Sequence, residues 1–255
     1  MVWAGRRRLD GDWQPAGSED TCRTGTNGPP SGQRHCVVSA EDDAARWEAA
    51  IERAYQARRR RYPDQALEWR LLYSPRRVLN GARVAFIGLN PGGRVVDPSH
   101  GKFSSEAGSA YRREVEDWGP SSALQDQVMA LFARLDVVPE EVLAGNLVPF
   151  RSPSEDTLQG APEAIAFGKT LWREILGKVT PRVVVSMGRT ANREIASLLR
   201  VRAARRYPTG WGNYTASRGT FPGGIWIGLP HLSQFKIMKR RESQEALDDL
   251  FRNLG

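Results

Sequence analysis

The sequence predicts an α/β protein, a three-layer α/β/α domain around a central, mostly parallel, four-stranded sheet. Three observations lead to this prediction. Short apolar runs rich in β-formers alternate with longer stretches of helical periodicity. The runs are apolar at successive positions, which is typical of strands buried on both faces of a parallel sheet. Several of them end in turns with polar residues, and ligands bind at such carboxyl ends of parallel strands.

The chain has 255 residues, of which 40% are hydrophobic, enough for one substantial core. Gly, Pro, Ser, Thr, Asp and Arg dominate residues 1–38 without a sustained period. We therefore expect a poorly ordered segment there and a single α/β domain over residues 39–255. A docking arm that orders on a partner is the alternative for the first segment.

The formal net charge is +8, which is compatible with a polyanionic partner, nucleic acid above all. The basic residues form separate clusters at 58–61, 200–206 and 236–241 rather than one tail. Cys22 and Cys36 are too few for a four-cysteine iron–sulfur or zinc site. No apolar run approaches the length of a membrane span and no signal peptide pattern opens the chain, so we expect a cytoplasmic protein.

The first helix is predicted to begin near Ser39, because Ser39 and Asp42 resemble a capping box. It should end before Pro63. A second, short helix is expected over residues 66–73, before Pro75. The apolar positions of the first helix fall at helical spacing: Ala44, Trp47, Ile51 and Tyr55.

The first strand is predicted over residues 84–88 (Val-Ala-Phe-Ile-Gly), and the turn after it reads Leu-Asn-Pro-Gly-Gly. Pro91 fixes its own φ, and Gly92 and Gly93 accept torsions that other residues resist. The loop that follows, residues 94–110, is longer than most connections. Such a loop indicates either function or disorder.

The rest of the chain continues the alternation of helices and strands. An amphipathic helix over residues 121–135 places Leu124, Val128, Leu131 and Phe132 on one face. The remaining predictions are a strand over 142–150, a helix over 162–176, a strand over 182–187, a helix over 191–199, an irregular or hairpin insertion over 207–220, a strand over 224–229 and a terminal helix that runs to Leu254.

Three strand ends carry polar or turn residues in a recurring way. They are residues 88–92 (Gly-Leu-Asn-Pro-Gly), 145–150 (Gly-Asn-Leu-Val-Pro-Phe) and 229–233 (Leu-Pro-His-Leu-Ser). One such end alone is an ordinary loop after a strand. All three in this order, with residues 183–191 between the last two, resemble the uracil-DNA glycosylase superfamily over residues 82–254. The resemblance implies the fold of that family.

The resemblance also implies roles for the first two motifs. Gly88, Pro91 and Gly92 match the backbone of the first motif, and Asn90 falls where the family positions or activates the hydrolytic water. Asn146 matches the asparagine with which the family reads a pyrimidine edge, through an amide that both donates and accepts. Without the resemblance, both asparagines are ordinary turn residues.

In this family an aromatic residue from the loop after the first motif usually stacks on the flipped base. Phe103 is the candidate, with Tyr111 behind it, and a core position for Phe103 is an equal alternative. The last motif departs from the family's usual His-Pro-Ser, because Leu229 stands where the histidine is expected. His231 therefore becomes the catalytic candidate at the base, with a contact to the DNA backbone as its alternative.

Basic and hydroxyl residues near the strand ends are candidates for contacts with DNA phosphates. The backbone at 188–191, at a helix start, can bind a phosphate through its free N–H groups. We expect neither a metal nor another cofactor. The side-chain candidates are Arg189, Thr190, Ser233, Lys236, Lys239, Arg240 and Arg241.

The resemblance implies a monofunctional DNA glycosylase that flips a modified pyrimidine out of DNA and hydrolyses its N-glycosidic bond, leaving an abasic site. The altered last motif and the long loop favour a modified base over ordinary uracil. Bacterial relatives directed against phages with hypermodified cytosines are one such case. Two alternatives stay open: a uracil-DNA glycosylase of base excision repair, and a catalytically weak member of the fold that only binds DNA or a partner.

Overall fold

The computed structural model describes residues 40–65, 67–93, 101–119 and 123–254. Residues 1–38, expected to be poorly ordered, lie outside the described residues. Six strands form one sheet in the order β2-β1-β3-β6-β5-β4. The strands are β1 (Val84–Gly88), β2 (Leu143–Asn146), β3 (Val183–Met187), β4 (Arg202–Pro208), β5 (Thr215–Phe221) and β6 (Gly224–Leu229).

The four strands that the sequence predicts are present and parallel: β1 pairs with β2 and β3, and β3 pairs with β6. The sheet is nevertheless wider than the predicted four strands. The hairpin of β4 and β5 adds two antiparallel strands at the β6 edge, where only an irregular or hairpin insertion is predicted. β4 is largely exposed and rich in arginine, as suits an edge strand, so it lacks the apolar run that identifies a buried strand.

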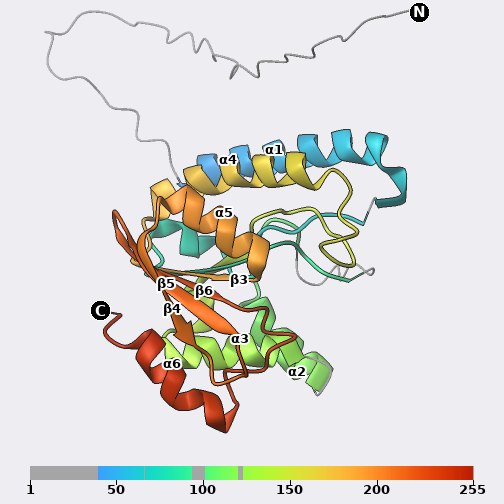
Figure 1. Ribbon diagram of the computed structural model, residues 1–255. Helices are drawn as coiled ribbons and strands as arrows, with labels where there is room; N and C mark the ends of the chain where they lie inside the picture. The colour runs from blue at the N-terminus through green and yellow to red at the C-terminus, as the bar shows by residue number, and fades with distance from the viewer. Residues whose placement is uncertain (1–39, 66, 94–100, 120–122, 255) are drawn as a thin grey trace, which may run out of the picture. The chain divides into compact units, whose positions relative to one another are not determined.

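Helices cover both faces of the sheet, which confirms the three-layer architecture (Figure 1). One layer contains α1, α4 and α5, and the other contains α2, α3 and α6. None of the described helices is long and apolar enough to cross a membrane. The helices are α1 (Ala40–Arg61), α2 (Ala110–Trp118), α3 (Ala123–Arg134), α4 (Ala161–Val179), α5 (Arg189–Leu199) and α6 (Gln244–Phe251), with short 3-10 helices at Pro63–Gln65, Arg76–Asn80, Pro139–Glu141 and Arg241–Ser243.

The helix predicted over residues 66–73 is not formed. Trp69 instead makes an antiparallel bridge to Phe150, and Leu72 makes one to Gly145. Backbone N–H groups of this segment donate to carbonyl groups in other parts of the chain, so the tertiary contacts override the local preference for a helix. The strand predicted over 142–150 is likewise shorter, because β2 ends at Asn146. α2 lies in a stretch for which the sequence analysis predicts no element.

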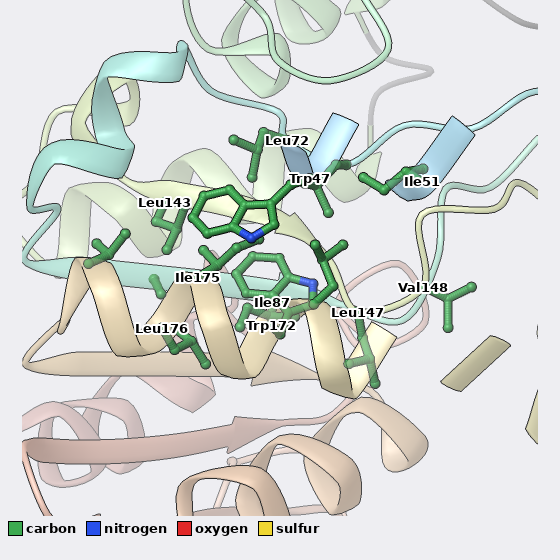
Figure 2. Close-up of a cluster of buried hydrophobic side chains, with 14 of the residues drawn as sticks. Trp47, Ile51, Leu72, Ile87, Leu143, Leu147, Val148, Trp172, Ile175 and Leu176 are labelled. Carbon is green, nitrogen blue, oxygen red and sulfur yellow. The ribbon is translucent and has the colours of Figure 1, made fainter. Parts of the chain in front are cut away.

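The first core lies between the sheet and the layer of α1 and α4 (Figure 2). Trp172 of α4 is fully buried in it, close to Ile87 and Leu147. The Trp172 indole N–H donates to the backbone carbonyl of Asn146 at 2.8 Å. A fully buried tryptophan with a satisfied N–H is a strong anchor, so α4 fixes the end of β2.

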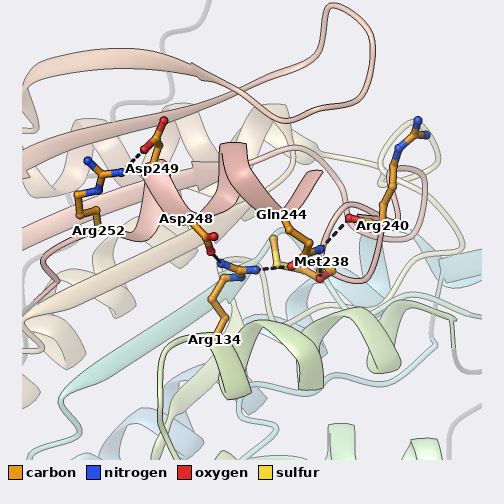
Figure 3. A network of polar contacts seen from close by, with 7 residues as sticks. All are labelled: Arg134, Met238, Arg240, Gln244, Asp248, Asp249 and Arg252. Carbon is orange, nitrogen blue, oxygen red and sulfur yellow. Dashed lines mark hydrogen bonds and ion pairs between the residues drawn. The ribbon is translucent and has the colours of Figure 1, made fainter. Parts of the chain in front are cut away.

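The second core lies between the sheet and α2, α3 and α6. Arg134 of α3 donates to Asp248 and to Gln244, both on α6 (Figure 3). Gln244 in turn donates to the backbone carbonyls of Met238 (3.1 Å) and Arg240 (2.7 Å). These contacts hold the segment between β6 and α6, which carries the last basic cluster.

Candidate active site

The carboxyl ends of the four parallel strands meet at one edge of the sheet, and a cavity of about 820 Å³ opens there. Ligands bind at this edge of an open parallel sheet. The strand-end residues that line the cavity are Gly88, Asn90, Asn146, Gly188 and His231. The structure thus brings together the two asparagines and the histidine to which the sequence analysis assigns the chemistry.

The side-chain amide of Asn90, two residues beyond β1, is held in one orientation. Its Nδ2 donates to the Ser152 hydroxyl (2.8 Å) and to the backbone carbonyl of Pro91 (3.1 Å). The Ser152 hydroxyl donates onward to the backbone carbonyl of Ser154 (2.6 Å). Both contacts use the amide donors, so Oδ1 has no partner among the described residues and can accept a hydrogen bond from a water molecule.

Gly88 and Asn146 are partners across β1 and β2. A β-carbon on residue 88 would lie 2.8 Å from Oδ1 of Asn146, closer than such atoms approach in proteins. Glycine at position 88 is therefore what lets the Asn146 side chain lie over β1. Pro91 and Gly92 form the turn beyond, and a β-carbon on Gly92 would meet nothing within 4 Å.

Asn146 is held by its backbone while its side-chain donor is left unused. The backbone N–H donates to the carbonyl of Leu71 at 3.1 Å, and the carbonyl accepts from Trp172. The residue is only 4% exposed, and its side-chain Nδ2 has no hydrogen-bond partner in the described part of the chain. A buried amide without a partner costs about 1–3 kcal/mol, so an acceptor on a ligand would be stabilised here.

Two buried tyrosines form part of the aromatic wall of the cavity, which also includes the exposed Trp118. Tyr73 and Tyr111 are stacked, with ring centroids 4.7 Å apart, and burial raises the pKa of the Tyr111 hydroxyl well above its ordinary value. Phe103 does not line the cavity. It is 2% exposed within the first core, with the Arg76 guanidinium over its ring. Tyr73 is not among the residues predicted for the site, because the sequence of residues 66–73 predicts a helix there.

His231 follows β6 and lies beside Gly188, the residue after β3. Its Nδ1 is 2.7 Å from the Ser233 hydroxyl. Burial lowers the pKa of His231 from its usual value, and the nearby carboxylate of Glu155 opposes this shift in part. The imidazole is therefore neutral at pH 7, and a proton donated by Ser233 to Nδ1 would leave the ring proton on Nε2.

Leu229, which replaces the family's usual histidine, is fully buried in the second core. Its backbone carbonyl accepts from the N–H of Gly188 (3.0 Å) and from the side chain of Asn192 (2.8 Å). Leu229 thus joins the ends of β3 and β6, and His231 is the residue of this motif that lines the cavity.

A buried ion pair also lines the cavity. Nη1 of Arg70 lies 3.2 Å from the Glu114 carboxylate, and both side chains are nearly inaccessible to solvent. Gln125 donates to the other carboxylate oxygen at 2.8 Å. The Arg70 guanidinium lies over the Tyr73 ring, 4.0 Å from its centroid. No strand-end motif contains these residues, so motif analysis could not identify them.

Two acidic residues, Glu155 and Asp156, line the cavity from the loop after β2. The Thr190 hydroxyl, a predicted phosphate contact, donates to the Glu155 carboxylate. No cluster of three His, Cys, Asp or Glu side chains suited to a metal ion occurs in the ranges that the structure describes.

The basic residues that are predicted to contact DNA phosphates differ in whether they already have a partner in the protein. Lys239 pairs with Asp126, and Arg240 lies over the Trp211 ring (4.6 Å) while facing Glu242. Three others are exposed and have no ion pair among the described residues: Arg189 at the start of α5, Lys236, and Arg241 at the start of the last 3-10 helix.

Comparison with known proteins agrees with this geometry. A search of curated proteins finds no match. The family model of the uracil DNA glycosylase superfamily matches residues 77–255, which include all six strands and the strand-end residues that line the cavity. The chain therefore belongs to the uracil DNA glycosylase superfamily.

Proposed function

We propose that this protein is a monofunctional DNA glycosylase that takes a flipped, modified pyrimidine into the cavity and hydrolyses its N-glycosidic bond. Membership of the superfamily supports an activity of the DNA glycosylase type. The observation that carries the proposal is the convergence of Asn90 and Asn146 on one cavity, with one free acceptor and one buried, unpaired donor. A base in a duplex can reach such a cavity only after it is flipped out.

Asn90 has the proposed role of positioning the attacking water. An amide is not a base at neutral pH, so its contribution is orientation: Oδ1 accepts a hydrogen bond from the water and holds its oxygen toward C1′ of the sugar. The C1′–O bond forms and the bond from C1′ to the base breaks, with its electron pair leaving on the base. One proton of the water is released to solvent and the other stays on the new hydroxyl at C1′.

Asn146 has the proposed role of reading the base edge. Nδ2 would donate to a ring carbonyl or ring nitrogen of the pyrimidine, which relieves the cost of the unpaired donor. Tyr111 is the aromatic residue we assign to the base pocket. Tyr73 already covers one face of its ring, so the base would meet another part of that aromatic pair.

His231 has the proposed role of stabilising the departing base. Negative charge develops on the base as the bond breaks, and a fixed donor at that place lowers the barrier. A neutral imidazole with its proton on Nε2 can supply such a hydrogen bond. Ser233 then acts as the orienting partner of His231, in addition to its proposed proximity to the DNA backbone.

The phosphates on either side of the flipped nucleotide are the proposed partners of Arg189, Lys236 and Arg241, which have no ion pair among the described residues. Thr190, Lys239 and Arg240 already have partners and would have to exchange them. Phosphate contacts of this kind position the protein without reading the sequence.

We favour a substituted cytosine over uracil, because a cavity of about 820 Å³ has room for a base that carries a substituent. We propose hypermodified cytosines of phage DNA, met in the cytoplasm, as the biological substrate. Repair of uracil is the second candidate, favoured only by membership of the family.

The proposal is tested with duplex and single-stranded oligonucleotides that carry uracil, cytosine or 5-hydroxymethylcytosine, and with DNA of a phage that has glycosylated cytosines. Alkali-labile abasic sites should appear on a modified substrate and should depend on Asn90. Cleavage of uracil alone would establish the repair alternative. Binding to all of these DNAs without any cleavage would establish a catalytically weak DNA-binding protein.

A further inference from the structure

Arg70 is a buried cation whose donors are only partly used. The residue is 5% exposed and lines the cavity. One of its nitrogens, Nη1, meets Glu114, while Nε and Nη2 are buried without a hydrogen-bond partner in the described part of the chain. Buried donors of a charged group are rarely left unpaired. A ligand that supplies an acceptor would therefore satisfy Nε and Nη2.

The position of Arg70 is fixed from several sides. Its backbone N–H donates to the carbonyl of Pro149 at 2.8 Å, and the next residue, Leu71, accepts from the backbone of Asn146. The guanidinium is packed on Tyr73 and paired with Glu114, which Gln125 holds in turn. Arg70 is thus a rigid element of the same wall as Asn146.

The charges around Arg70 indicate what kind of ligand group it can bind. Glu114 already neutralises the guanidinium, and the rest of the lining includes Glu155 and Asp156 together with the cation Arg151. A second carboxylate placed beside Arg70 would be repelled by Glu114. An uncharged oxygen accepts a hydrogen bond without this repulsion, so hydroxyl, ether or carbonyl oxygens suit the unpaired donors.

We propose that Arg70 is a specificity-determining residue that binds an uncharged, oxygen-bearing substituent of the flipped base. Asn146 would read the pyrimidine ring, and Arg70 would read what the ring carries. This inference rests on the proposed glycosylase function and narrows its substrate class. A site built to bond an oxygen rejects analogues that lack it, because its buried donors then stay unpaired.

The test compares single-turnover excision from matched oligonucleotides that carry 5-methylcytosine, 5-hydroxymethylcytosine or 5-carboxylcytosine. The wild-type protein should prefer the hydroxymethyl base over the other two, by on the order of 10²-fold. Arg70→Lys keeps a cation for Glu114 but removes the fork of donors, so it should reduce this ratio to within a few-fold. Arg173→Lys, exposed on α4 outside the cavity, is the matched control and should keep the ratio.

Two further measurements keep the outcome decisive. The double variant Arg70→Met/Glu114→Gln removes both charges together, so a loss of fold in Arg70→Lys would not obscure the result. Thermal shifts with the free bases measure recognition without cleavage.

If no DNA is cleaved but free 5-hydroxymethylcytosine stabilises only proteins with Arg70, the glycosylase proposal fails and the role of Arg70 stands. Cleavage with equal rates for the three bases, or an unchanged ratio in both variants, would overturn the role of Arg70. Neither cleavage nor any thermal shift would overturn both.

Discussion

Gly88 and Asn146 face each other across the first two strands at a distance that leaves no room for a β-carbon on residue 88. That β-carbon would lie 2.8 Å from Oδ1 of Asn146. The first two motifs therefore form one structural unit, because the glycine of the first motif leaves room for the asparagine side chain of the second.

Replacing Gly88 with alanine should displace the Asn146 side chain and reduce excision by about 10²-fold, the scale expected for a misplaced contact. Single-turnover kinetics on the best substrate measures the loss. Gly177→Ala is the matched control, because a β-carbon there meets nothing within 4 Å and Gly177 lies in α4, away from the cavity. Equal rates for Gly88→Ala and the control would show that Asn146 does not need its present position.

Ser152 should act through Asn90. Replacing Ser152 with alanine removes the acceptor that orients the amide, so excision should fall by about 10-fold, less than the ~10²-fold or greater loss expected for Asn90→Ala. The double variant should be no slower than Asn90→Ala, because the two residues form one unit. Ser154→Ala is the control, since Ser154 meets Ser152 through its backbone carbonyl. Additive losses in the double variant would give Ser152 an independent role.

His231 makes a prediction about pH. Burial lowers the pKa of His231 below its ordinary value near 6.5, so the imidazole is already neutral at pH 7. If the neutral ring donates the hydrogen bond, the rate of excision should be constant from pH 7 to 8.5. His231→Ala should then lose excision, and His231→Gln should retain part of it. A tenfold loss per pH unit above neutrality would show instead that an imidazolium is required.

The same shift also predicts a change in stability. The folded state resists protonation of His231, so the free energy of unfolding should fall as pH drops below 6.5 toward the lowered pKa. His231→Gln should remove that part of the pH dependence. Urea titrations of both proteins between pH 5 and 7.5 measure the difference, and parallel curves would contradict it.

The sequence predicts the parts of this fold that obey local rules. The four parallel strands are continuous apolar runs, and the residues at their ends follow from the strand assignments, so Asn90, Asn146 and His231 are found together at one edge. What could not be predicted depends on tertiary contacts. The 66–73 segment pairs with residues around β2 instead of forming a helix, and this brings Arg70 and Tyr73 into the cavity wall.

The two aromatic candidates illustrate the same limit. Phe103 and Tyr111 are both buried aromatic residues after the first motif, and no local pattern distinguishes them. Phe103 packs in the first core under Arg76, whereas Tyr111 reaches the cavity because α2 places it on Tyr73. Because the sequence does not predict α2, it does not show which of the two aromatic residues reaches the cavity.

The last prediction concerns the basic residues after β6, which differ in their partners. Lys236 and Arg241 are exposed without an ion pair among the described residues, whereas Lys239 already pairs with Asp126. A phosphate contact releases condensed counterions and contributes about 0.9 to the slope of log affinity against log salt on duplex DNA. Lys236→Gln and Arg241→Gln should therefore each flatten the slope by about 0.9 and weaken every DNA sequence alike. Lys239→Gln should change the slope less, because the charge of Lys239 is already matched by Asp126.

Fluorescence anisotropy from 50 to 300 mM salt measures the slope for all three variants on one labelled duplex, with Asn90→Ala as the background so that cleavage does not interfere. If Lys239→Gln flattens the slope as much as the other two, the DNA displaces Asp126 on binding; if none of the three moves it, the phosphates lie on another face.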